Sequence, residues 1–92
     1  MNTRRPPGLA LAPRRYEALM YLANHVEASN RDIAAAIGIS DDGQASRLLA
    51  RMEELGLIRN RNPYNHGAPN AWQLTADGRR LVRALESVAG AI

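Results

Sequence analysis

The stretch AAIGISDDGQASRLLARM, residues 35–52, determines how the rest of the chain is interpreted. An alanine-rich amphipathic segment ends at Gly38, a residue type typical of the position just after a helix. A second amphipathic segment begins near Asp42, and we expect Asp41 and Asp42 to stabilise its start through capping and the helix dipole. The apolar residues of this second segment recur at the spacing of one helix face: Ala45, Leu48, Leu49, Met52 and Leu55. We therefore predict two helices joined by a tight turn.

A further amphipathic segment precedes this pair of helices. Apolar residues at helical spacing predict a first helix over residues 13–26. They are Tyr16, Leu19, Met20, Ala23 and Val26. Ser29 or Asn30 is expected to cap the short helix that follows, and Ile39 in the turn is expected to pack into the core. The expected buried stripe of that short helix consists of Ile33, Ala34 and Ile37.

Two short segments with strand character follow Gly56, which is expected to end the third helix. They span residues 57–61 and 71–75, and the turn-forming residues between them predict a hairpin with a long tip. Thr75 is then expected to cap a last helix over residues 76–88. The resulting fold class is mainly α with a small β-hairpin, in the order helix, helix, helix, strand, strand, helix. This order is the winged helix-turn-helix arrangement, in which the hairpin forms the wing.

The length of 92 residues predicts one folded domain. Two adjacent prolines and a glycine predict a flexible arm over residues 1–12, which leaves residues 13–92 for the winged-helix domain. The chain has no cysteine, so it has neither disulfides nor a cysteine zinc site. Without a long apolar run or the apolar core of a signal peptide, we expect a soluble, cytoplasmic chain.

The positive charge lies mainly outside the central helices. The net charge is +3, and all 12 basic residues are arginine. Residues 1–15 carry four arginines and no acid, residues 31–58 are net acidic, and residues 59–70 are basic again. This mild excess permits nucleic-acid binding but does not establish it.

Two stretches of the chain resemble the winged-helix core of bacterial MarR-type transcriptional regulators. They are NRDIAAAIGISDDGQASRLLARMEELGLIRN, residues 30–60, and AWQLTADGRRL, residues 71–81. The shared elements are a Gly-Ile-Ser turn at residues 38–40, a helix that leads into Gly-Leu-Ile at 56–58, and Leu-Thr-Ala-Asp-Gly-Arg at 74–79. The resemblance covers about residues 29–83, and it implies a DNA-binding regulator.

Two departures from the family pattern stand out. The distance from Gly38 to Gly56 is one residue longer than usual, and the extra residue falls in the stretch Asp-Asp-Gly-Gln. The long flanking helices through which the family dimerises are largely missing. The chain is therefore either a minimal regulator or one module of a longer protein.

The resemblance implies a set of DNA-binding residues. In a winged helix the N-terminal half of the third helix enters the major groove, where Gln, Ser and Arg side chains bind base edges. Gln44, Ser46 and Arg47 are accordingly predicted to read bases. The predicted phosphate contacts are Arg31, Arg51, Arg59 and Arg61, and the predicted wing contacts also include Tyr64, Asn65 and His66.

Each of these predictions has a simpler alternative. Arg47 and Arg51 are alternatively part of a solvated helix face, paired with Glu54 or a nearby aspartate. Arg31 is alternatively paired with Asp32 or Glu27.

Asp41 and Asp42 would repel a DNA backbone unless the extra residue turns them away or one accepts a hydrogen bond from cytosine. Gly43 either permits close approach of a phosphate or is an ordinary loop residue.

The expected partner is double-stranded DNA, bound by a homodimer formed through the first and last helices. The alternative function is a winged helix used for protein–protein contact within a larger assembly, which the aspartate pair favours. A further alternative is a small-molecule or metal sensor.

The sequence shows no cofactor site and no catalytic site. His25 and His66 lack the spacing of a metal site, and no residues mark a ligand pocket or a catalytic constellation. We therefore predict no cofactor and no enzyme. Trp72 is expected in the core.

Overall fold

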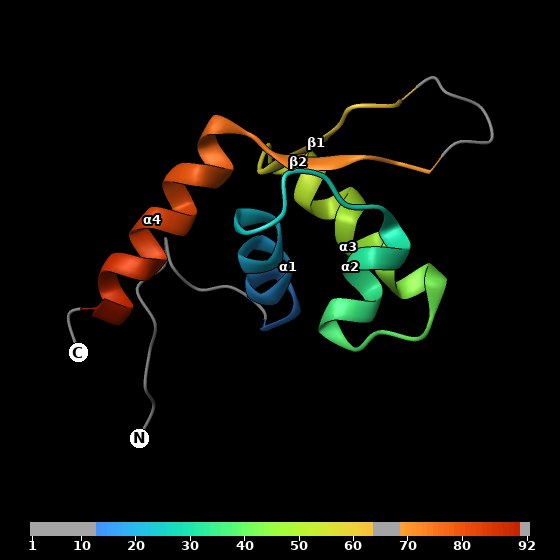
Figure 1. The fold of residues 1–92 in the computed structure, drawn as a ribbon, viewed down its shortest axis with the longest axis horizontal. Helices are drawn as coiled ribbons and strands as arrows, with labels where there is room; N and C mark the ends of the chain where they lie inside the picture. The colour runs from blue at the N-terminus through green and yellow to red at the C-terminus, as the bar shows by residue number, and fades with distance from the viewer. Residues whose placement is uncertain (1–12, 64–68, 91–92) are drawn as a thin grey trace.

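The predicted order of elements is confirmed in the computed structural model, which describes residues 13–63 and 69–90 (Figure 1). Across these residues, no helix is both long and apolar enough to cross a membrane. The elements are α1 (Pro13–Ala23), α2 (Asn30–Ile37), α3 (Asp42–Glu54), β1 (Ile58–Asn60), β2 (Trp72–Leu74) and α4 (Ala76–Gly90).

The ends of α2 are set by local hydrogen bonds. Ser29 is the N-cap: its hydroxyl accepts a bond from the Asp32 backbone N–H, and the Asp32 carboxylate accepts one from the Ser29 N–H, both at 3.1 Å. This reciprocal pair is a capping box, and it satisfies two backbone donors that would otherwise lack partners. Gly38 ends the helix with φ 76°, a conformation that glycine adopts without strain. The sequence prediction of both ends is confirmed.

Helix α1 ends at Ala23, three residues earlier than predicted. The Asn24 amide donates to the Met20 carbonyl at 3.0 Å, and the His25 ring stacks on Tyr21 with its Nδ1 2.8 Å from the Tyr21 carbonyl oxygen. These polar side chains bind carbonyl groups of the last turn, where a helix has no internal donors left. Val26 is consequently 83% exposed and lies outside the core, so its predicted place on a buried helical face was wrong.

After α1 the chain is extended and pairs with the wing. Ala28 and Trp72 exchange two backbone hydrogen bonds, at 3.2 and 2.9 Å. This contact joins segments that are far apart in the sequence, which explains why local periodicity placed the end of α1 too late.

The core lies where the helices and the wing strands meet, and Val82 is the buried residue that α4 contributes. Helix α1 contributes Leu19, α2 contributes Ile33, α3 contributes Leu49 and Met52, and β1 contributes Ile58, all almost fully buried. Trp72 is buried as predicted, and Ile39 packs partly against the same cluster. Leu55 was predicted to be buried but is 43% exposed, because α3 ends at Glu54 and Leu55 follows the last helical turn.

The wing is an antiparallel pair in which Ile58 opposes Leu74 and Asn60 opposes Trp72. At its base, the Thr75 hydroxyl donates to the Gly56 carbonyl at 2.5 Å and accepts from the Gly78 N–H at 3.0 Å, so Thr75 caps α4 as predicted. A side chain at Gly78 would lie 2.1 Å from the Leu57 carbonyl oxygen. Glycine therefore allows α4 to pack directly against the backbone before β1.

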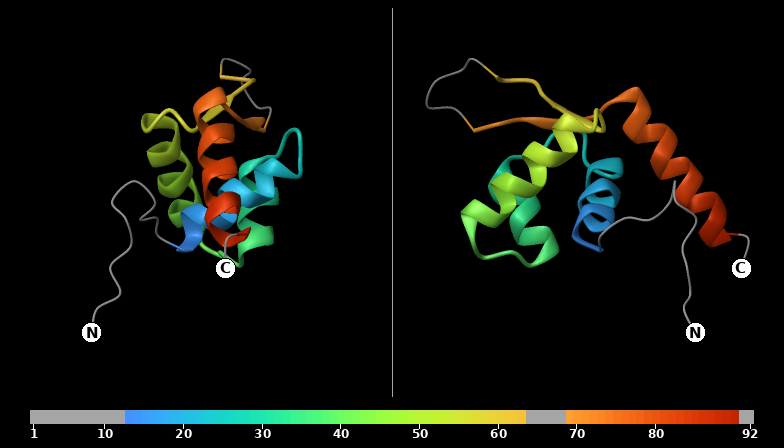
Figure 2. Two further views of the ribbon diagram at one scale, coloured as in Figure 1. Left: turned by 90° about the vertical axis from the view of Figure 1, so that its left-hand side faces the viewer. Right: turned by 180° about the vertical axis from the view of Figure 1, so that it is seen from behind.

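The elements are divided between two sides of the molecule. The start of α3, the start of α2 and the wing strands face one side, on the right in Figure 1. Helix α4 lies on the opposite side, next to α1, and the view from behind shows the same division (Figure 2). Any surface formed by α3 and the wing is therefore separate from α4.

Candidate nucleic-acid interface

Helix α3 has one buried face and one exposed face. Ala45, Leu49 and Met52 are buried against the core. The predicted base-reading and phosphate-contacting residues of this helix are all exposed: Gln44, Ser46, Arg47 and Arg51. The structure thus leaves these side chains available on the outer surface of α3.

The N-terminus of α3 is occupied by its own chain. Asp41 is the N-cap, and its Oδ1 accepts hydrogen bonds from the backbone N–H groups of Gly43, at 2.8 Å, and Gln44, at 3.2 Å. The carboxylate is therefore turned back onto the positive end of the helix dipole. This geometry agrees with the prediction that Asp41 caps the helix, and it places the charge against backbone donors.

Gly43 lies in the first turn of α3 and is not a loop residue. A Cβ atom at this position would lie 3.2 Å from Asp41 Oδ1 and 3.3 Å from Arg47 Nη1. A side chain here would therefore be in tight contact with both the Asp41 carboxylate and the Arg47 guanidinium.

A depression of about 590 Å³ lies between the starts of α2 and α3 and residues 69–70 of the wing, which precede β2. Its polar lining brings side chains of α2, α3 and the wing together: Ser29, Asn30, Arg31, Asp42, Ser46 and Asn70. Both carboxylates considered as partners for Arg31 are engaged elsewhere, since Asp32 forms the capping box and Glu27 pairs with Arg61. Arg31 is exposed at the edge of this depression.

Ion pairs involve two of the predicted phosphate contacts. Arg51 pairs with Glu54 at 3.4 Å, the alternative considered from the sequence, and Arg61 pairs with Glu27 at 2.5 Å. Both arginine side chains are more than half exposed, and such surface pairs contribute little free energy, so an anion can compete for either guanidinium.

Arg59 is exposed on the wing, where its Nη2 lies 3.3 Å from the amide oxygen of Gln73. Tyr64, Asn65 and His66 lie outside the described residues.

Polar residues that sequence analysis did not assign to the site connect the wing to α3. Asn30 was considered only as a helix cap, Asn70 only as a turn former, and Asn60 not at all. Their side-chain amides are hydrogen-bonded to one another, and Asn30 also bonds to Ser46. Only their positions in the folded chain bring them together, since the bond between Asn30 and Asn70 spans 40 residues.

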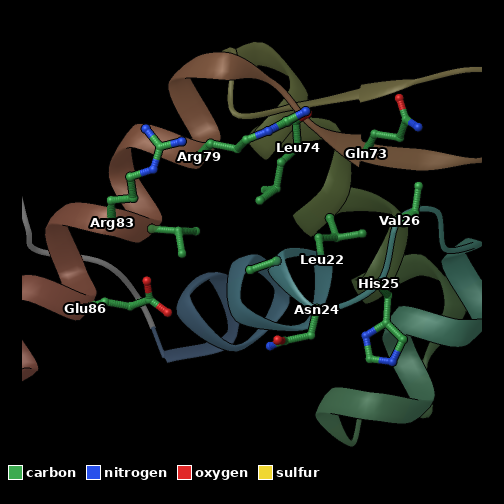
Figure 3. Close-up of a pocket in the computed structure, with 11 residues that line it drawn as sticks. Leu22, Asn24, His25, Val26, Gln73, Leu74, Arg79, Arg83 and Glu86 are labelled. Carbon is green, nitrogen blue, oxygen red and sulfur yellow. The ribbon is translucent and has the colours of Figure 1, made fainter.

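A second depression, of about 500 Å³, lies between the end of α1, β2 and α4 (Figure 3). Leu22, Leu74 and Val82 form its apolar part, and Arg79, Arg83 and Glu86 line it from α4. The Arg79 guanidinium also donates to the Leu74 carbonyl at 3.1 Å. The sequence contained no sign of this concavity.

Comparison with known proteins identifies the fold. A MarR family model matches residues 10–67. The chain belongs to the MarR family. Proteins of this family are winged-helix transcription regulators without enzymatic activity. No curated protein sequence matches the chain.

Solved structures of MarR-family regulators superpose closely on the chain. MepR of S. aureus in complex with DNA has a TM-score of 0.81 and 24% identity, and the match covers 92% of this chain and 69% of MepR. A mutant form of MepR has a TM-score of 0.79 and 25% identity, with 88% and 60% covered. ZitR of Lactococcus lactis in complex with DNA has a TM-score of 0.70 and 23% identity, with 80% and 49% covered. The chain thus spans between 49% and 69% of the length of these proteins.

Proposed function

We propose that this chain binds double-stranded DNA sequence-specifically and regulates transcription. The observation that carries the proposal is the exposed face of α3, which lies on the same side of the molecule as the start of α2 and the wing. Two structurally similar MarR-family proteins, MepR and ZitR, are solved with DNA bound. A regulator of this kind would act in the cytoplasm.

The proposed roles follow from side-chain chemistry. Gln44, Ser46 and Arg47 read base edges in the major groove, where Gln pairs with adenine and Arg with guanine. The wing lies at the minor groove or the adjoining backbone. Arginines on three elements bind phosphates and set the register of the protein on the duplex: Arg31, Arg51, Arg59 and Arg61.

We further propose that the chain binds DNA as a homodimer through α1 and α4. Tyr16 on α1 and Val88 on α4 are large apolar side chains that remain 39% and 48% exposed. A dimer would cover them and would double a footprint that is short for one module. Residues 1–12, proposed as a flexible arm, lie outside the described residues.

The test is fluorescence anisotropy with a labelled random-sequence duplex at low and moderate salt. The variant Arg47→Ala/Arg51→Ala removes two cations from α3, and Arg80→Ala/Arg83→Ala removes two from α4 as the matched control. We expect wild-type binding to weaken steeply with salt, because bound phosphates release counterions. The α3 variant should bind at least about tenfold more weakly, whereas the control should stay within about twofold of wild type.

Failure of the folded wild type to bind DNA at low salt contradicts the proposal. The alternative function would then be a protein-interaction module, which the acidic residues Asp41 and Asp42 at the start of α3 favour. Equal losses in both arginine variants would show non-specific attraction to net charge instead of binding through α3.

The depression beside α4 favours effector binding as a second candidate function. Its apolar residues suit a small molecule, and its two arginines, Arg79 and Arg83, outnumber Glu86 and so favour one that carries a carboxylate. A thermal-shift screen with small carboxylic acids tests this candidate, because a ligand that binds only the folded state raises the unfolding midpoint. The variant Arg83→Ala should lose the shift, whereas Arg80→Ala should keep it.

A further inference from the structure

Three asparagine side chains form a continuous relay of hydrogen bonds from the wing to α2. Within the wing, Asn60 Oδ1 accepts from the backbone N–H groups of Asn62, at 3.0 Å, and Ala71, at 2.9 Å. Asn60 Nδ2 donates to Asn70 Oδ1 at 2.9 Å, and this bond joins the two sides of the hairpin. The first half of the relay therefore holds the hairpin together beyond its last strand pair.

The second half of the relay leaves the wing and ends on α3. Asn70 Nδ2 donates to Asn30 Oδ1 at 3.1 Å, and the same oxygen accepts from Trp72 Nε1 at 2.5 Å. Asn30 Nδ2 then donates to the Ser46 hydroxyl oxygen at 3.4 Å. Asn30 is the first residue of α2 and is half-buried, so it connects the wing to the exposed face of α3.

All the amides of the relay point the same way. Each NH₂ group donates to the oxygen of the next member, from Asn60 to Asn70, to Asn30 and to Ser46. Aligned hydrogen bonds of this kind polarise one another. At the end of the chain, the Ser46 oxygen accepts the bond, so its own hydroxyl proton remains available for another acceptor. Ser46 is exposed, so an acceptor from another molecule can reach this proton.

We propose that the relay Asn60–Asn70–Asn30 positions Ser46 as a hydrogen-bond donor to DNA and couples this donor to the placement of the wing. The inference rests on the proposed DNA-binding function. The acceptor is a phosphate oxygen or an acceptor on a base edge, both of which a serine hydroxyl can bind. Asn30, Asn60 and Asn70 are positioning residues, since they act on DNA through Ser46 and the wing.

The sharpest variant is Asn30→Asp. An aspartate of the same shape still accepts from Trp72 and Asn70, so the wing half of the relay is kept. It cannot donate to Ser46, and the serine hydroxyl instead donates to the new carboxylate. The hydroxyl proton is thereby withdrawn from DNA, whereas the fold retains its other contacts.

The experiment is a double-mutant cycle on DNA affinity, with Asn30→Asp and Ser46→Ala measured singly and together. In the wild-type background, we expect Ser46→Ala to weaken binding about threefold to tenfold, the value of one hydrogen bond. In the Asn30→Asp background, the same substitution should change affinity by less than about twofold. The repulsion of DNA by the added carboxylate is present on both sides of the comparison and cancels.

A second double-mutant cycle tests the link to the wing and uses Asn70→Ala in place of Asn30→Asp. In the Asn70→Ala background, the loss of DNA affinity caused by Ser46→Ala should again shrink. In an Asn62→Ala background, that loss should remain at the wild-type value. Asn62 is the matched control because it takes part in the relay through its backbone N–H.

Trp72 is the only tryptophan in the sequence, so its single indole N–H resonance in an NMR spectrum reports the relay directly. That resonance should move in Asn70→Ala and stay in place in Asn62→Ala.

The outcomes separate this inference from the proposed function. Equal losses on Ser46→Ala in all backgrounds, with wild-type DNA binding intact, overturn the relay and leave the DNA-binding proposal standing. Absence of DNA binding by the folded wild type overturns both. Dispersed amide spectra of every variant establish that the comparisons are between folded proteins.

Discussion

The carboxylate of Glu27, in the loop before α2, pairs with the guanidinium of Arg61, the residue that follows β1 in the wing, with 2.5 Å between Oε2 and Nη1. The same carboxylate oxygen lies 3.5 Å from the Gln73 amide nitrogen on β2. Glu27 therefore connects the α1–α2 loop to both sides of the wing. It also neutralises part of the positive charge that the wing offers to a phosphate.

Removal of this carboxylate should strengthen DNA binding. In Glu27→Gln, Arg61 becomes free to pair with a phosphate, and we expect affinity to rise about twofold to fivefold at low salt. The slope of log affinity against log salt should become steeper by up to about one, the value for one more neutralised phosphate. Fluorescence anisotropy measures both quantities.

Glu86→Gln on α4 is the charge-matched control for this prediction, because Glu86 lies on the other side of the molecule. A similar gain in both variants would mean that net charge alone is responsible. The double variant Glu27→Gln/Arg61→Ala should lose the gain.

The α3 cap predicts a difference between two substitutions at Asp41. Asp41→Ala removes the acceptor of the Gly43 and Gln44 N–H groups and should lower the free energy of unfolding by about 1 kcal/mol. Asp41→Asn keeps an acceptor oxygen and should lower the free energy of unfolding by only about a few tenths of 1 kcal/mol. Urea unfolding followed by circular dichroism gives both values, and equal losses would show that the charge, and not the hydrogen bonds, supports the helix.

Gly78→Ala should destabilise the protein, although alanine is the better helix former. The new methyl group would meet the Leu57 carbonyl oxygen, a backbone atom that cannot move without shifting β1. We expect the free energy of unfolding to fall by about 1–3 kcal/mol, the usual cost of overpacking.

The control is Gly43→Ala, where the nearest atoms are side-chain ends at 3.2 Å, Asp41 Oδ1, and 3.3 Å, Arg47 Nη1, so the new methyl group requires shifts much smaller than at Gly78. Urea unfolding should show this variant within about 0.5 kcal/mol of wild type or slightly more stable. Equal destabilisation of both glycine variants would contradict the close packing of α4 on the backbone before β1.

The capping box of α2 should make stability depend on pH in the acid range. Hydrogen bonds from the Ser29 backbone N–H, and then from its side chain, hold the pKa of Asp32 below its ordinary value. As the pH falls, the Asp32 carboxylate is therefore protonated in the unfolded chain before it is protonated in the folded chain. This difference in proton binding favours unfolding. The stabilisation is fully present above the ordinary aspartate pKa and is lost as the pH falls through the lower pKa of the folded state.

Urea unfolding between pH 7 and pH 3 measures this contribution. Asp32→Asn should be less stable than wild type at pH 7, and the difference should shrink on acidification. Ser29→Ala should also be less stable, because it removes the acceptor of the Asp32 backbone N–H. Alanine keeps the backbone N–H that is the first cause of the lowered Asp32 pKa, so the loss in Ser29→Ala should change less with pH than the loss in Asp32→Asn. A difference that stays constant over this range would rule out ionised Asp32 as the source.

The order of the elements followed from the sequence because the signals involved are local. Apolar spacing in α2 and α3, the capping residues Ser29 and Asp41, and Gly38 at the turn each act within a few residues. The exposed face of α3 followed as well, since burial of Ala45 and Leu49 leaves the other side of the helix in solvent. These signals and the family resemblance were sufficient for the winged-helix fold and for the α3 residues of the proposed interface.

Tertiary structure alone decided how these elements meet. Pairing of Ala28 with Trp72 draws the chain after α1 into an extended conformation, and that pairing spans 44 residues. The Glu27–Arg61 pair and the Asn30–Asn70 bond span 34 and 40 residues. The sequence around one residue of such a contact gives no indication of where its partner lies, because the partner is outside the range of helical or strand periodicity. The sequence by itself therefore determined the helices and their caps. Only tertiary packing decided which polar groups join the wing to α3.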